Sequence, residues 1–190
     1  IKELTDSASK VRGVLISDFV YGVITPRVLA TITELVAKHS LLVIGDLQCS
    51  SQVGNVSKFK DFELICPTER EARIAVGTQD EGVEWVANAL MSQTKSKNLV
   101  MKLGGQGFIA YETETDKFIN RQHFPALSIN PVDVSGAGDS LLAALSVGLC
   151  SGATLMQSSA IGAGMASLAV QQVGNFPVSY QHLKNHLSKI

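Results

Sequence analysis

The chain has 190 residues, of which 45% are hydrophobic and 17% are charged, and its formal net charge is −1. This composition predicts a soluble globular protein and gives no reason to expect nucleic acid or an anionic membrane as a partner. The three cysteines, Cys49, Cys66 and Cys150, follow no metal-binding or disulfide spacing. No apolar run reaches the ~18 residues of a membrane span. We therefore expect a cytoplasmic protein.

Apolar, β-prone runs alternate with helical patterns along the whole chain. Strands are expected over residues 11–16, 41–44, 62–66, 98–103 and 108–111. Helices are expected over residues 26–39, 69–72, 81–92, 137–150 and 154–172, and from Ser179 onward. This alternation predicts βαβ units in a mostly parallel sheet, and one α/β domain over residues 1–190.

Polar residues and glycines follow several of the expected strands. In α/β sheets the ligand binds at the carboxyl ends of the strands. We therefore expect one crevice to be lined by Asp18, Asp46, Thr68, Gly104 and the segment that begins at Asp133.

The most informative segment is D-V-S-G-A-G-D over residues 133–139, directly before an expected helix. Small residues at Gly136, Ala137 and Gly138 let the backbone approach a ligand and point several N–H groups at an anion. Asp139 in the first helical turn could then accept a proton from a substrate hydroxyl. The residues alone leave open a simpler interpretation, in which this is a helix-start turn with an acidic first-turn residue.

This segment resembles the D-T-x-G-A-G-D signature of PfkB/ribokinase-type sugar kinases. The resemblance implies an ATP-dependent kinase with a three-layer αβα, ribokinase-like sheet. It also implies that Asp139 is the catalytic base and that residues 136–138 form an anion hole. In this family the segment also binds a monovalent cation in many members, which implies Asp133 and Ser135 as ligands of K⁺.

Residues 102–107 resemble the family's T-x-G-x-x-G nucleotide loop. Lys102 stands at the Thr position, and Gly104 and Gly107 match the two glycines. Glycines after a strand allow the backbone to pass close to phosphate or ribose. Read without the resemblance, the same residues favour a hairpin turn.

Two further segments match the family pattern. Gly174 and Asn175 match the loop near the adenine pocket, and Ala163 stands where many members have Asn. Residues 67–71 resemble P-N-x-x-E, which implies that Glu71 helps to hold Mg²⁺ through water, although Thr68 replaces Asn. Read alone, glutamates in a first helical turn only compensate the helix dipole.

The substrate side resembles the heptose-phosphate kinases of lipopolysaccharide synthesis. Residues 17–22 resemble their S-D-Y-x-K-G segment, which implies Asp18 and Gly22 as substrate-binding residues. Tyr21 and Gln48 replace two lysines of that group, so two cations for a substrate phosphate are missing. The expected acceptor is a sugar or sugar phosphate, with heptose 7-phosphate as one candidate.

Members of this family carry a further N-terminal part with the first strands, a di-glycine sugar motif and a β-lid. None of these appears before Val11. We therefore expect residues 1–190 to be the C-terminal, nucleotide-binding and catalytic portion of a single ribokinase-like domain. Such a portion is expected to have little activity alone and to associate with the N-terminal part or with a second copy. A non-catalytic nucleotide- or sugar-binding module and an adenosine-type nucleoside kinase remain alternatives.

Overall fold

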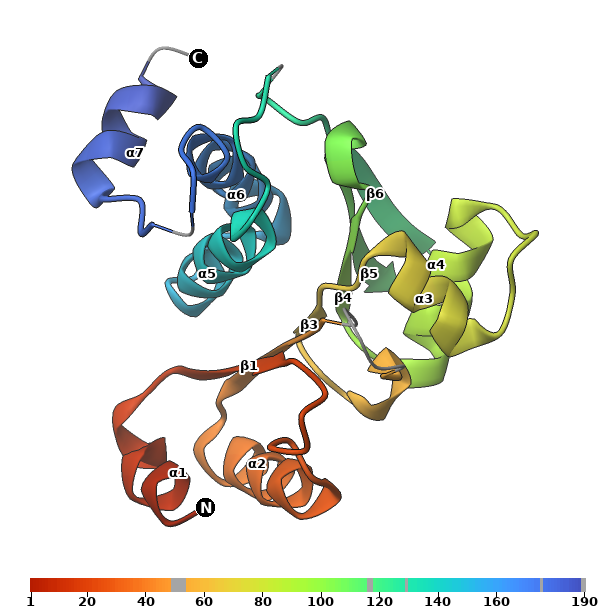
Figure 1. The fold of residues 1–190 in the computed structure, drawn as a ribbon. Helices are drawn as coiled ribbons and strands as arrows, with labels where there is room; N and C mark the ends of the chain where they lie inside the picture. The colour runs from red at the N-terminus through yellow and green to blue at the C-terminus, as the bar shows by residue number, and fades with distance from the viewer. Residues whose placement is uncertain (49–53, 116–117, 129, 175, 189–190) are drawn as a thin grey trace. The chain divides into compact units, whose positions relative to one another are not determined.

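The computed structural model describes residues 1–48, 54–115, 118–128, 130–174 and 176–188. The chain divides into two compact units, residues 1–101 and residues 102–190. Figure 1 shows the helices and strands of both units. The candidate site residues are distributed between the two units.

The first unit is built on a parallel sheet in which strands β1, β2, β3 and β4 pair in that order. Helices connect successive strands, as expected for βαβ units (Figure 1). The elements are α1 (Lys2–Ser7), η1 (Ala8–Lys10), β1 (Gly13–Asp18), α2 (Pro26–His39), β2 (Leu42–Leu47), η2 (Val56–Lys58), β3 (Leu64–Ile65), α3 (Glu69–Val76), α4 (Val83–Thr94) and β4 (Asn98–Lys102).

Local sequence signals explain where the helices of this unit begin. Helix α2 begins at Pro26, because the preceding Thr25 side chain accepts a hydrogen bond from the N–H of Val28 (3.3 Å). The helix ends at Ser40, which adopts the left-handed conformation. Strand β3 is shorter than the expected strand over residues 62–66, and α4 lies two residues further along than expected.

A glycine on β2 positions the segment that follows η2. A Cβ atom at Gly45 would lie 2.9 Å from the rings of both Phe59 and Phe62, which a side chain cannot do without displacing them. The two rings stack with centroids 5.0 Å apart and both are buried. This contact holds the chain from η2 onward against β2 and so determines where Lys58 lies.

The second unit combines a β-hairpin with three helices. Strands β5 and β6 pair antiparallel, and the rings of the partner residues Phe108 and Phe124 stack with centroids 5.1 Å apart at one end of this pairing. Strand β6 was not expected from the sequence, and β5 is longer than the expected strand over residues 108–111. The elements are η3 (Gly104–Gln106), β5 (Phe108–Thr115), β6 (Phe118–Phe124), α5 (Ala137–Cys150), α6 (Leu155–Ala169) and α7 (Tyr180–Leu187).

Glycines allow the three helices of the second unit to pack closely. A Cβ atom at Gly148 of α5 would lie 2.4 Å from Oγ of Ser158 on α6. A Cβ atom at Gly164 of α6 would lie 2.8 Å from the side chain of Leu187 on α7. The expected helix over residues 137–150 is confirmed, whereas α6 ends at Ala169 rather than at residue 172.

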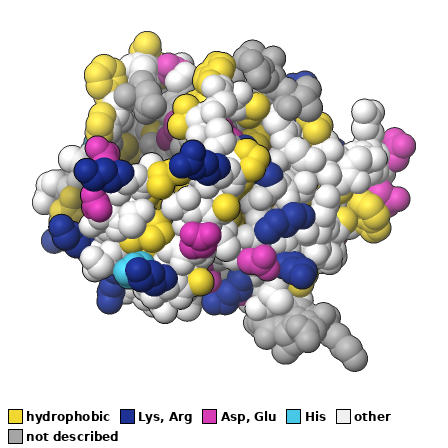
Figure 2. Space-filling model, turned by 90° about the horizontal axis from the view of Figure 1, so that it is seen from below, with side chains coloured by type: hydrophobic (Ala, Val, Ile, Leu, Met, Phe, Trp, Pro, Cys, Tyr) yellow, Lys and Arg dark blue, Asp and Glu magenta, His cyan; other side chains and the backbone are white. Residues whose placement is uncertain are grey.

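The surface carries both signs of charge. Figure 2 shows one face on which lysine and arginine side chains are interspersed with aspartates and glutamates, in keeping with the net charge of −1. Within the described part of the chain, no helix combines the length and the apolar character required to cross a bilayer.

Candidate active site

The signature segment forms a turn that leads directly into α5. Gly136 precedes the helix with φ +77°, a left-handed conformation that glycine adopts without steric cost. The N–H groups of a first helical turn have no acceptor one turn earlier in the helix, so they are available to caps and ligands. Here the Ala137 N–H donates to the carbonyl of Val134 (3.3 Å), a long bond within the turn.

Asp139 lies in the first turn of α5 and is partly exposed. A carboxylate at this position lies beside the positive end of the helix dipole, which stabilises its charged form and also attracts anions. The structure thus places Asp139 at the start of α5, and its role at an anion site stays a prediction.

Asp133 connects the signature segment to the predicted adenine loop. Its Oδ1 accepts the N–H of Ser135 and its Oδ2 accepts the N–H of Gly174, both at 2.9 Å. The hydrogen bond from Gly174, and after it the bond from Ser135, holds the pKa of the Asp133 carboxyl below its usual 3.8. The N–H of Val132 also donates to the carbonyl of Val170 (2.7 Å). The structure thus brings Asp133, Ser135 and Gly174 together, while Asn175 lies outside the described residues.

The predicted nucleotide loop is a tight turn between β4 and β5. The Leu103 N–H donates to the carbonyl of Gly107 (2.8 Å), and the Gly107 N–H donates to that of Gly104 (3.0 Å). Both glycines have positive φ, +59° at Gly104 and +88° at Gly107. A Cβ atom at Gly107 would lie only 2.1 Å from the carbonyl oxygen of Phe124. Gly107 is therefore required by the hairpin itself, whereas Gly104 is exposed and has open space around it.

Lys102 brings this loop into contact with the signature segment. Its Nζ lies 3.7 Å from the point that a Cβ atom of Gly138 would occupy, and its Cδ lies 3.9 Å from the same point. The side chain therefore runs along the first turn of α5. Two segments predicted to handle phosphate groups thus meet within the second unit.

The second unit also contains an apolar hollow of about 330 Å³. It is large enough for a small planar ring system, and apolar walls are typical of ligand sites. Its walls come from the end of β6 and the residues after it, from α6, and from the last turn of α7. The lining residues are Phe124, Pro125, Leu127, Ala160, Ile161, Ala163 and Leu187.

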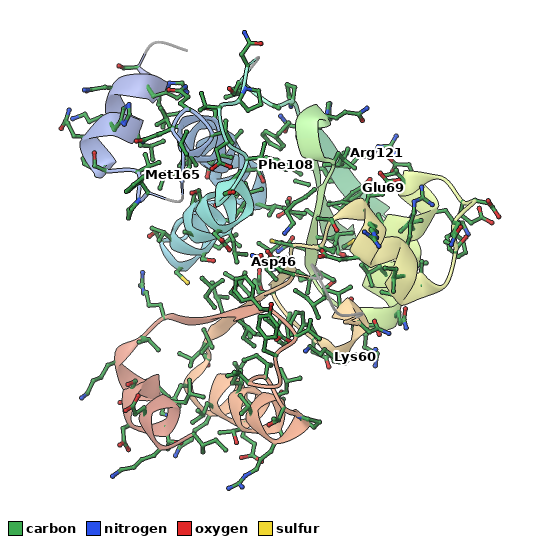
Figure 3. The ribbon with its side chains drawn as sticks, in the orientation of Figure 1. Asp46, Lys60, Glu69, Phe108, Arg121 and Met165 are labelled. Carbon is green, nitrogen blue, oxygen red and sulfur yellow. The ribbon has the colours of Figure 1, made fainter. Side chains whose placement is uncertain are left out.

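In the first unit, two buried carboxylates lie at the carboxyl ends of adjacent parallel strands. Asp18 is the last residue of β1. Asp46, which is labelled in Figure 3, lies opposite Ser17 in the register of β1 and β2. Asp18 is 3% exposed and Asp46 is fully buried. Asp46 Oδ1 accepts the N–H of Leu47 (3.0 Å). Thr68 follows β3 at the same edge of this parallel sheet, as predicted.

Asp18 forms an ion pair that sequence reasoning did not single out. Its Oδ2 pairs with the ammonium group of Lys58, and its Oδ1 accepts the N–H of Val20 (2.9 Å). Val20 has φ +62°, an unfavourable conformation for a β-branched residue. Lys58 lies 40 positions from Asp18 in the sequence, so no local pattern shows that the two residues meet. Gly22, with φ +84°, has open space around it.

Glu71 is buried at the start of α3. Its Oε2 accepts the N–H of Thr68 (2.7 Å), and Oγ1 of Thr68 accepts the N–H of Glu71 (3.2 Å), which is a capping box. Among the described residues, no group of three or more His, Cys, Asp or Glu side chains could hold a metal ion. A single carboxylate fits Mg²⁺ only as a ligand that acts through retained water, which magnesium commonly keeps.

The comparison with protein families identifies the class of protein. Residues 2–178 match the family described as pfkB family carbohydrate kinase, so the chain belongs to this family. The resemblance inferred from residues 133–139 is confirmed at the level of the family.

Curated relatives agree with this assignment. The chain is 30% identical over 169 residues to the bifunctional protein HldE of Trichlorobacter lovleyi, covering 87% of this chain and 33% of that protein. It is 28% identical over 179 residues to HldE of Campylobacter fetus, covering 93% of this chain and 37% of that protein. The chain therefore spans about a third of the length of the curated relatives that it matches.

The solved structures establish the fold. Arabidopsis thaliana ribokinase, complexed with ribose and ATP, matches with a TM-score of 0.80 and 21% identity, covering 98% of this chain and 59% of that one. Escherichia coli phosphofructokinase-2, in complex with potassium, matches with a TM-score of 0.78 and 20% identity, covering 99% of this chain and 61% of that one. The predicted ribokinase-like α/β fold with a mostly parallel sheet is confirmed.

Proposed function

We propose that the protein transfers the terminal phosphoryl group of ATP to a hydroxyl of a sugar or sugar phosphate. The observation that carries this proposal is the position of Asp139, partly exposed in the first turn of α5 directly after the left-handed Gly136. A base at this point lies next to backbone amides that can hold the group being transferred. Membership of a carbohydrate kinase family supports the same chemistry.

In the proposed reaction, Asp139 accepts the proton of the acceptor hydroxyl while the hydroxyl oxygen forms a bond to the terminal phosphorus. The bond from this phosphorus to the bridging oxygen breaks, and ADP leaves with the bonding electrons. The amides of Gly136, Ala137 and Gly138 stabilise charge on the phosphoryl oxygens. Such catalysis depends mainly on positioning and electrostatics.

Magnesium, when bound, supplies positive charge to the phosphate groups, and Glu71 would orient one of its water ligands. The short hydrogen bond from the Thr68 N–H fixes the orientation of the Glu71 carboxylate (2.7 Å). Glu71 is therefore held in the capping box with Thr68, and we assign it a contact with Mg²⁺ through water. We also assign Asp133 and Ser135 to a site for a monovalent cation such as K⁺.

For the nucleotide, we assign the turn over residues 102–107 and Gly174 to the phosphates and ribose, and the apolar hollow to the adenine ring. The hollow supports this assignment because its walls are apolar and its volume of about 330 Å³ can hold a planar ring system. Replacing Ala163 with Phe would fill the hollow and should raise the Kd for ATP about tenfold or more. Unchanged ATP affinity in this variant would show that the adenine ring binds elsewhere.

For the acceptor, we assign Asp18 and Gly22 to substrate binding and consider a heptose phosphate the first substrate to test. Support comes from the S-D-x-x-x-G pattern over residues 17–22 and from the relatives named HldE. A panel containing heptose 7-phosphate, ribose and adenosine separates the sugar-phosphate, sugar and nucleoside acceptors. Phosphorylation of adenosine alone would make the protein a nucleoside kinase.

The decisive experiment compares Asp139→Asn with Glu84→Gln in the full-length protein. Both residues are acids in the first turn of a helix, so both substitutions should change the free energy of unfolding by at most ~1 kcal/mol. Only Asp139→Asn should lower kcat, by about 10²–10⁴-fold, with the Kd for ATP nearly unchanged. Wild-type turnover in Asp139→Asn would refute the proposal, and ATP binding without ADP release by the wild type would indicate a binding module.

A further inference from the structure

Lys102 departs from the pattern of the nucleotide loop that it occupies. The nucleotide loop of the family begins with Thr at this position, whereas this chain has a lysine at the end of β4. Thr offers one neutral hydroxyl on a short side chain. Lys offers three donors and a full positive charge on a long, flexible stem.

The conformation of Lys102 places this charge at the start of α5. Its Nζ lies 3.7 Å from the Cβ position of Gly138, an ordinary van der Waals distance, so the ammonium group lies against the backbone of the first helical turn. The charge is therefore next to the first-turn amides and the positive end of the helix dipole. Both features attract the same kind of ligand, which is an anion with several oxygens.

We propose that the ammonium group of Lys102 binds the phosphoryl oxygens of the nucleotide and stabilises the charge that moves with the transferred group. This inference rests on the proposed kinase function. It adds a side-chain contact with phosphate to the loop over residues 102–107, whose other proposed contacts with the nucleotide come from the backbone. Lysine is a common phosphate ligand because its point charge can follow the phosphate during transfer. Asp139 lies one residue beyond Gly138, so base and cation flank the same turn.

The phosphate contact and a purely structural role predict different results. A contact to phosphate makes the effect of losing the ammonium group grow with the number of phosphates in the ligand. A role confined to positioning Asp139 would lower kcat and leave nucleotide affinity unchanged. Adenosine, ADP and ATP are therefore the probes, and their Kd values are measured by calorimetry at two salt concentrations.

The variants are Lys102→Met, Lys102→Thr and Lys102→Arg in the full-length protein, with Lys97→Met as the matched control. Lys97 lies on the same stretch of chain, but it is exposed and pairs with Glu63 (3.0 Å). Lys102→Met should weaken ATP binding about tenfold, ADP binding less and adenosine binding hardly at all, and should lower kcat about 10–10²-fold. Lys102→Thr should have the same effects as Lys102→Met, and Lys102→Arg should retain most of the affinity for ATP. The control Lys97→Met should match the wild type.

Two patterns of results would overturn the inference while leaving the kinase function intact. One is wild-type ATP affinity in Lys102→Met and Lys102→Thr, and the other is an equal loss for adenosine and ATP. A wild-type protein that neither binds ATP nor transfers phosphate would instead overturn the proposed function, and the inference with it. Thermal unfolding of each variant shows whether the compared proteins are folded. Lys102→Arg keeps the positive charge and so tests whether the charge is sufficient for phosphate binding.

Discussion

The N–H of Gly174 donates to Oδ2 of Asp133 at 2.9 Å, across 41 positions of sequence. This one hydrogen bond joins the first residue of the D-V-S-G-A-G-D segment to the glycine of the predicted adenine loop. Because Oδ1 of the same carboxylate accepts the N–H of Ser135, the side chain holds both ends of the site at once. The orientation of the turn before α5 therefore depends on Asp133, which we assign to the monovalent-cation site and not to the transfer step itself.

The pH dependence of this link is the first prediction. Hydrogen bonds from Gly174 and then Ser135 lower the pKa of Asp133 below 3.8. A carboxyl whose pKa is lower in the folded state stabilises the fold fully above its unfolded pKa, and the contribution is lost as pH falls through the folded pKa. We expect a carboxyl ¹³C titration of Asp133 with a midpoint below 3.8 and protection of the Gly174 amide above it. The Asp133→Asn variant identifies the signal by removing it, and a midpoint at or above 3.8 would contradict the assignment.

The second prediction separates the two glycines of the nucleotide loop. Gly107→Ala should lower the free energy of unfolding by about 2–4 kcal/mol, because its Cβ would lie 2.1 Å from the carbonyl oxygen of Phe124. Gly104→Ala has positive φ but no neighbour within 4 Å, so it should cost only about 1 kcal/mol. Chemical denaturation measures both values. Equal costs for the two variants would show that the hairpin does not need the close approach at Gly107.

The third prediction concerns the cap of α3. Thr68→Ala removes the side-chain acceptor for the Glu71 N–H and should cost about 1 kcal/mol of stability. Thr68→Asn restores the residue usual in the family and retains a capping oxygen, so stability should stay within about 0.5 kcal/mol of the wild type. Urea denaturation of the two variants tests the difference. A loss in Thr68→Asn as large as that in Thr68→Ala would mean that the cap contributes little.

The fourth prediction tests the ion pair at the end of β1. Lys58→Met leaves the buried Asp18 carboxylate without its cation and should cost about 2–4 kcal/mol of stability. Lys60→Met is the control, because Lys60 lies on the same stretch (Figure 3) and its Nζ donates to the exposed Gln93 carbonyl (2.7 Å). The control should cost at most about 1 kcal/mol. Double substitution of Lys58 and Asp18 by Met and Asn should recover part of the loss, and no recovery would argue against a direct pair.

Short-range signals were enough for the elements whose causes are local. Thr25 and Pro26 mark the start of α2, and the glycines before Asp139 mark the start of α5, because caps and left-handed turns depend on a few adjacent residues. Strand β6 was missed because the pattern over residues 118–124 mixes polar and apolar side chains. Such a strand is stable only through its pairing with β5.

The sequence by itself determined the class of this protein, since the string over residues 133–139 is specific and needs no distant partner to be recognised. Only the tertiary structure decided that Lys58 reaches Asp18, that Lys102 lies over Gly138, and that Asp133 holds the loop at residue 174. These contacts join residues that are far apart in the chain. Their geometry follows from the packing of strands and helices around buried side chains, which no local pattern encodes.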